Sequence, residues 1–172
     1  MKELKVDLLN SKKERVATSI ELSKFNIFIG SDFDNIRTII RNARIEDSVY
    51  AYGDFGSSDC ISEHKSLVYR FVKHHSNRNK IAVIHTESQF VLYAFNNLIF
   101  NYIVKDKMPA NLRDEMTCKD IMIDPKDIRI YQVDNGIVTR IQNKDGLIEH
   151  NCFDSEMNII MNDFYKMIDY YE

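Results

Sequence analysis

The residues best placed to do chemistry follow a short apolar run, in the pattern of a loop that holds phosphate groups. The apolar run Phe25–Ile29 ends at Gly30, and residues 31–38 have the character of a loop that turns into a helix. At such a junction, backbone N–H groups and the positive end of the helix dipole bind phosphate. Phosphoryl chemistry there also needs a lysine and a hydroxyl at fixed spacing from the glycine.

The lysine and the hydroxyl are missing at that spacing. Counted from Gly30, the pattern G-x-x-x-x-G-K-[ST] places Asn35 at the second glycine. It places Ile36 at the lysine and Arg37 at the hydroxyl that binds magnesium. Ile36 offers neither a charge nor a hydrogen bond. If the loop is one residue longer, Arg37 and Thr38 stand in for the pair, because arginine can also contact phosphate.

Hydrophobic periodicity predicts the elements that would position this loop. Alternation of polar and apolar residues, or a continuous apolar run, predicts strands at 2–9, 15–20, Phe25–Ile29, Val49–Tyr52, 80–85, 127–134, 137–142 and 147–150. Apolar residues at helical spacing predict helices from the loop to about residue 44, at 62–75, at Gln89–Val104 and from Asp154 onward. Asp134-Asn135-Gly136 predicts a hairpin turn. Alternating strands and helices, with hairpins at both ends, predict an α/β fold.

Composition sets bounds on the class of protein. The chain has 172 residues, which predicts a single domain over 1–172. A formal net charge of -3 gives no overall attraction to nucleic acid, so we expect no direct nucleic-acid binding. The apolar stretches are too short to span a bilayer and the N-terminus lacks an apolar signal core. Its three widely spaced cysteines suit reduced thiols, so we expect a cytoplasmic protein without membrane contact.

The order of segments resembles the ATPase head of the ABC class, in its SMC, RecF and OLD nuclease branch. The resemblance rests on the hairpin and strand that lead to Gly30, on 49–54 in the place of an Asp-Glu strand, and on 81–90 in the place of a strand ending in Thr-His-Ser. Residues 127–131 and 144–146 look like the closing strands of such heads. The resemblance implies a mixed sheet with flanking helices, as a reduced P-loop NTPase architecture with edge β-hairpins.

Against this family the nucleotide site looks degenerate. Asp54 is the one acid left of the Asp-Glu pair, with Gly53 and Phe55 on either side of it. His85 and Glu87 stand exchanged at the switch, where a carboxylate would repel a γ-phosphate. Residues 36–49 leave no room for the helical lobe that carries the signature motif.

The resemblance therefore implies no catalytic residue, no cofactor and no resident metal, with ATP and Mg²⁺ binding left as an alternative. The vestigial nucleotide site that it implies comprises Gly30, Asn35, Ile36, Arg37, Thr38, Asp54, His85 and Glu87.

Three further groups of residues invite a chemical interpretation. Cys60 and His64 have helical spacing, but a zinc site needs about four ligands and no second pair accompanies them. Acidic residues that would gather at neighbouring strand ends are interpreted as a surface patch rather than a metal site: Asp32, Asp34, Asp54, Asp59 and Glu87. Aromatic residues on helix faces are assigned to core packing rather than to base stacking: Tyr69, Phe71, Tyr93, Phe95 and Phe100.

The C-terminal segment is the candidate interaction surface. Methionine and aromatic side chains there could pack in the core or dock on a partner. The residues concerned are Met161, Phe164, Tyr165, Met167, Tyr170 and Tyr171.

These features predict a non-catalytic, pseudo-ATPase protein-interaction module. Its partner would be a protein, either an ABC-type ATPase head or a second copy of itself. Such a chain would serve as an accessory, assembly or inhibitory protein, including one encoded by a bacteriophage or a defence locus. Two alternatives stay open: a divergent nucleotide-binding subunit completed in trans, and a structural component of a large assembly.

Overall fold

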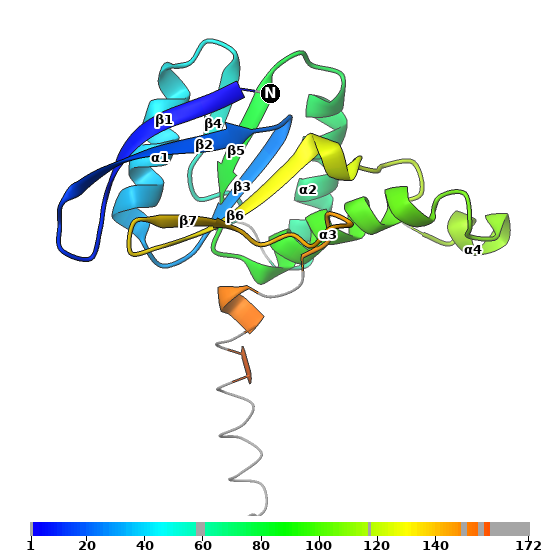
Figure 1. Cartoon of the computed structure of the whole chain (residues 1–172). Coiled ribbons are helices and arrows are strands. Elements are labelled where there is room, and N and C mark those ends of the chain that lie inside the picture. Colours follow the sequence, from blue (N-terminus) through cyan, green and yellow to red (C-terminus); the bar gives the residue numbers. More distant parts are fainter. Residues whose placement is uncertain (1, 58–60, 117, 149–150, 155–156, 159–172) are drawn as a thin grey trace, which may run out of the picture.

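Five strands form the central sheet of this protein in a computed structural model (Figure 1). The strands follow one another in the order β4 (Val49–Tyr52), β5 (Ile81–His85), β3 (Phe25–Ile29), β6 (Ile128–Asp134) and β7 (Ile137–Arg140). The first four run parallel and β7 runs antiparallel to β6. The structure describes residues 2–57, 61–116, 118–148, 151–154 and 157–158. The predicted α/β class, with a mixed sheet and flanking helices, is confirmed.

The central strand β3 is apolar on both faces because helices cover both. All five of its residues are buried, including Asn26, whose amide bonds to Ser23 and to the carbonyl of Ala82. Parallel strands covered on both faces show such continuous apolar runs. The asparagine is tolerated because its side-chain polar groups are all hydrogen-bonded.

Two separate apolar cores lie on the two faces of the sheet. On one face, α1 (Phe33–Ile45) packs with Ile36, Ile39 and Ile40 against the sheet and against the N-terminal hairpin. On the other face, α2 (Ile61–Ser76) and α3 (Gln89–Val104) form the second core with the sheet. Figure 1 shows this division, with α1 behind the blue hairpin and α2 and α3 on the opposite side.

The N-terminal hairpin is a sheet of its own. Strands β1 (Lys2–Leu9) and β2 (Arg15–Leu22) pair antiparallel over their full length and join no strand of the five-stranded sheet. The prediction of hairpins at both sheet edges is therefore wrong for this one and right for β6–β7. The alternating residues Leu4, Val6 and Leu8 are buried against α1, so the hairpin covers a helix and not a sheet edge.

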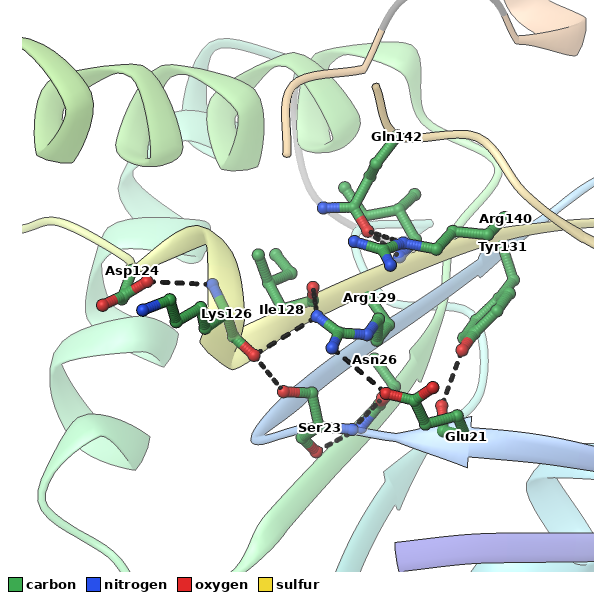
Figure 2. A network of polar contacts seen from close by, with 11 residues as sticks. Glu21, Ser23, Asn26, Asp124, Lys126, Ile128, Arg129, Tyr131, Arg140 and Gln142 are labelled. Atoms are coloured by element: carbon green, nitrogen blue, oxygen red, sulfur yellow. Dashed lines mark hydrogen bonds and ion pairs between the residues drawn. The ribbon is translucent and has the colours of Figure 1, made fainter. Parts of the chain in front are cut away.

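A polar network fastens the hairpin to the start of β6 (Figure 2). The guanidinium of Arg129 donates to Glu21 at 3.1 Å, and the hydroxyl of Tyr131 donates to the Glu21 carbonyl at 2.6 Å. The hydroxyl of Ser23 donates to the carbonyl of Lys126 at 2.7 Å. These bonds hold the connection between β2 and β3 against the start of β6.

Element bounds differ modestly from those predicted. Strand β2 extends to Leu22, and α2 runs one residue further at each end than predicted. The 3₁₀ turn η1 (Pro125–Asp127) precedes β6, which shortens that strand at its start. The segment near residues 109–119 contains the short helix α4 (Ala110–Asp114). Beyond β7, the described residues 147–148 of the predicted strand at 147–150 contribute a single bridge, between Gln142 and Ile148.

The described C-terminal residues 152–154 and 157–158 are helical, as predicted from Asp154 onward. Within the described part of the chain, no helix combines the length and apolar character needed to cross a bilayer.

Candidate functional site

The strand order creates a crevice at the carboxyl ends of β3 and β5. These neighbouring strands are followed by helices on opposite faces of the sheet, α1 after β3 and α3 after β5. In open α/β sheets, ligands bind at such a switch point, outside the carboxyl ends of the strands. Gly30, Asp54 and His85 follow or end the three strands that meet there.

The loop after β4 is tied to the end of β5, and this places Asp54. The N–H of Phe55 donates to the carbonyl of His85 at 2.8 Å, and the hydroxyl of Thr86 donates to the carbonyl of Phe55 at 2.8 Å. Asp54, the residue before Phe55, has a φ of +54°, in the left-handed region that aspartate tolerates better than most residues. Held strain of this kind often marks functional positions.

His85 is the buried member of the site. It is 4% exposed, and its Nδ1 lies 3.5 Å from Oδ1 of Asp54. Its Nε2 is buried and has no hydrogen-bond partner. Burial lowers the pKa of His85 below its usual value and outweighs the nearby Glu87 and Asp54 carboxylates, which raise it. The ring of Phe33 stands edge-on to the imidazole.

Glu87 completes a three-residue cluster. One potential ligand atom each from Asp54, His85 and Glu87 lies within 4.8 Å of the others. Both carboxylates belong to exposed residues, while the imidazole is buried. The residues predicted for the acidic strand end and for the switch are thus brought together in space.

Arginines of α1 form the opposite wall of a pocket of about 250 Å³ at this site. Arg37, Arg41 and Arg44 line it together with Asp54 and His85. Their spacing of four and three residues puts all three on one face of the helix. Arg41 and Arg44 were not among the predicted site residues, although this spacing is visible in the sequence.

The connection from β3 to α1 is too short to wrap a phosphate group. Only Gly30, Ser31 and Asp32 separate the strand from the helix, which begins at Phe33. Gly30 has a φ of +124°, and a Cβ there would lie 2.3 Å from the carbonyl oxygen of Val133. The glycine is therefore explained by close packing against β6.

The two positions that a phosphate-binding loop would use face inward. Ile36 is buried in the core beneath the hairpin. The side chain of Asn35 accepts from the N–H of Leu9 at 2.7 Å and donates to the Leu9 carbonyl at 2.8 Å. Both residues thus hold β1 against α1.

Asp32 closes the N-terminal end of α1. Its carboxylate accepts from the N–H of Gly136 at 2.8 Å and from the side chain of Asn35 at 2.8 Å. Asp32, Asp34 and Asp134 line a separate pocket there. The predicted acidic residues therefore divide between two places, because Asp32 bonds to the turn between β6 and β7 while Asp54 and Glu87 lie with His85.

Arg37 and Thr38, the alternative pair for phosphate, both contact Asp34 of α1. The Arg37 guanidinium is 4.0 Å from Asp34, and its side chain is largely exposed. The hydroxyl of Thr38 donates to the Asp34 carbonyl one helical turn earlier.

Of the remaining candidates, His64 is buried and its Nδ1 lies 2.8 Å from the hydroxyl of Ser88. Cys60 and Asp59 lie outside the described residues, as do the C-terminal residues Met161, Phe164, Tyr165, Met167, Tyr170 and Tyr171.

The aromatic residues of α3 divide between core and surface. Phe95 is buried, as are Tyr69 and Phe71 of α2, which confirms core packing for these three. The prediction was wrong for Tyr93 and Phe100, which are exposed, as is Phe90 at the start of the helix. α3 is apolar on nearly all sides, so periodicity alone could not separate its covered face from its open face.

No family model, curated protein or solved structure matches this chain. What can be said of its function therefore rests on the geometry described above.

Proposed function

We propose that this protein is a non-catalytic protein-interaction module that self-associates through the outer face of α3. The observation that carries the proposal is the exposure of Phe90, Tyr93 and Phe100, which follow one another at three and seven residues along one helix face. Isolated apolar side chains are common on protein surfaces, whereas several on one face mark an interaction site. On this face the exposed Asn97 lies between Tyr93 and Phe100. We call these three residues the α3 stripe.

The chemistry beside the α3 stripe fits an acidic partner segment. The neighbouring helix α2 exposes Lys65, Arg70 and Lys73, and Lys65 and Phe100 line one surface pocket with Met108. Glu115 lines the same pocket and α2 also exposes Glu63, so the described charges of α2 and this pocket are three cations and two carboxylates beside the aromatic stripe. Such a surface attracts a partner that is apolar and negatively charged.

The C-terminal part of the same chain has that composition. Beyond residue 153 its charged residues are Asp154, Glu156, Asp163, Lys166, Asp169 and Glu172, interleaved with methionine, isoleucine and aromatic residues. We infer that residues 159–172 of one copy bind the α3 stripe of another.

The described end of the chain favours binding between copies over binding within one. The hydroxyl of Tyr93 donates to Asp154, so the chain passes beside the α3 stripe. Met157, the next apolar side chain, is 42% exposed. The exposed methionine at this point is available to a second copy of the chain.

The inward-facing side chains of Asn35 and Ile36 in α1 support the proposal that the protein is non-catalytic. In a degenerate ABC-type head, the positions that should cradle phosphate would be expected to take structural roles, and Asn35 and Ile36 have such roles here.

Sedimentation velocity of the full chain tests the self-association. Between about 1 and about 100 µM, the range suited to an interface of modest size, we expect the mass to rise from monomer to dimer. Phe100→Ser should weaken the dimer about tenfold because it removes one aromatic anchor.

Ile45→Ser is the matched control, since Ile45 of α1 is 76% exposed and lies on the other face of the sheet. This variant should associate like the wild type. A wild-type chain that stays monomeric throughout, or a Phe100→Ser variant that associates normally, would overturn the proposal.

A further inference from the structure

We propose that Asp54, His85 and Glu87 bind one divalent transition-metal ion at the carboxyl ends of β4 and β5. The site is independent of the α3 stripe, because it lies at the switch point of the sheet and uses none of the same residues. Its ligand set, one imidazole and two carboxylates, differs from a phosphate loop that holds magnesium through a hydroxyl.

The spacing of the potential ligand atoms suits a shared ion. Two ligand atoms that each lie about 2.1 Å from one ion are about 3.0 to 3.4 Å apart at tetrahedral or octahedral angles. Nδ1 of His85 and Oδ1 of Asp54 are 3.5 Å apart, which is long for a hydrogen bond and close to that spacing. Glu87 lies within 4.8 Å, and its exposed side chain has the rotamer freedom to close the difference.

The His85 ring and the backbone of the Asp54 loop are held in place before any ion arrives. The bonds from Phe55 and Thr86 hold the loop of Asp54 on the end of β5. His85 is 4% exposed, so packing restricts its ring. Prior fixing of ligands lowers the entropy cost of binding an ion.

The two ring nitrogens of His85 have different surroundings, and Nδ1 is the one placed to bind an ion. Nearly all buried side-chain nitrogens in native proteins have hydrogen-bond partners, and each exception needs an explanation. Nε2 of His85 is buried with none, while Nδ1 faces the Asp54 carboxylate.

The donor set indicates the class of ion. Imidazole suits zinc, iron and copper, while carboxylates also suit manganese, so Mn²⁺ and Zn²⁺ are the ions that match a mixed set. Three protein ligands leave coordination positions open to water. Arg37 and Arg41 line the adjoining pocket, so an anion could share the open positions.

Manganese titration of the full-length protein tests the site. Mn²⁺ is the appropriate probe because thiolates bind it weakly, so the cysteines compete little. Electron paramagnetic resonance of free Mn²⁺ should show one bound ion per chain. His85→Ala and Glu87→Gln should each weaken binding about tenfold or more.

Glu87→Gln keeps the experiment decisive if His85→Ala fails to fold, since Glu87 is exposed. Asp47→Asn is the control: this exposed carboxylate in the turn after α1 should leave binding unchanged. Bound Mn²⁺ should also broaden the NMR signals of the Phe33 ring, which contacts His85. No binding by the wild type, or equal binding by Glu87→Gln, would overturn the proposal.

Discussion

Asn35 illustrates how one side chain can occupy a position that resembles a ligand site. It stands where a phosphate-binding loop has its second glycine, yet both ends of its amide bond to the backbone of Leu9. The amide nitrogen also donates to Asp32. A buried amide with all its partners inside the protein is a structural element and leaves nothing for a ligand.

Asn35→Ala should therefore lower the free energy of unfolding by about 2 kcal/mol, because it leaves the Leu9 backbone groups unpaired in a part-buried site. Urea denaturation measures the change. Asn42→Ala, further along α1, removes one bond to the carbonyl of Thr38 in its own helix and should cost much less. Equal effects of the two variants would mean that the bonds to Leu9 add nothing.

Single residues also set the limit of prediction from sequence. The residue types in the pattern predicted that Ile36 does not serve phosphate, but they did not predict that it would pack beneath the hairpin. The approach of Asp54 to His85 depends on the bonds made by Phe55 and Thr86, which link two loops distant in sequence. Such contacts leave no local signal.

At the scale of elements, α2 is coupled to β4 through His75. This histidine is 2% exposed, its Nε2 lies 3.3 Å from the hydroxyl of Tyr52, and its ring packs on Phe71. Burial lowers the pKa of His75, and the positive charges of His74 and Arg78 lower it further. The folded state therefore favours the neutral ring.

This coupling predicts a pH-dependent stability. The unfolded chain takes up the proton more readily than the folded protein. The contribution of His75 to stability should therefore be complete above about pH 6.5, and it should be lost as the pH falls from about 6.5 through the lower pKa of the folded state. His75→Gln should reduce the loss of stability that thermal unfolding measures between about pH 7.5 and about pH 5.5. His74→Gln, at the neighbouring exposed position, should retain most of this pH-dependent loss of stability. An unchanged slope in His75→Gln would contradict the assignment.

The bounds of an element were predicted well where a local sequence signal marks its end. The bounds of α3 match the prediction because Ser88 caps the helix by accepting from the N–H of Val91. The partner of an element was harder to predict. Alternation in β1 correctly indicated one buried face, but a helix covers that face here and a sheet edge was expected.

For the whole molecule, opposite charges at the proposed interface predict a salt effect. Raising sodium chloride from about 0.1 M to about 0.5 M should increase the dissociation constant of the dimer several-fold, because screening weakens attraction between the basic surface of α2 and an acidic segment. Sedimentation velocity at both salt concentrations measures the change. Stronger association at high salt would indicate a purely apolar contact.

The place where the turns of both hairpins meet α1 also bears on how the chain folds while it is being synthesised. A Cβ on Gly136 would lie 2.4 Å from the carbonyl oxygen of Leu9, and its N–H bonds to Asp32 across 104 positions of sequence. During synthesis on a ribosome, β3 emerges long before either of its neighbours β5 and β6. The nascent chain must therefore carry an apolar, unpaired strand until β6 and its turn have been translated, which makes it a natural client for chaperones.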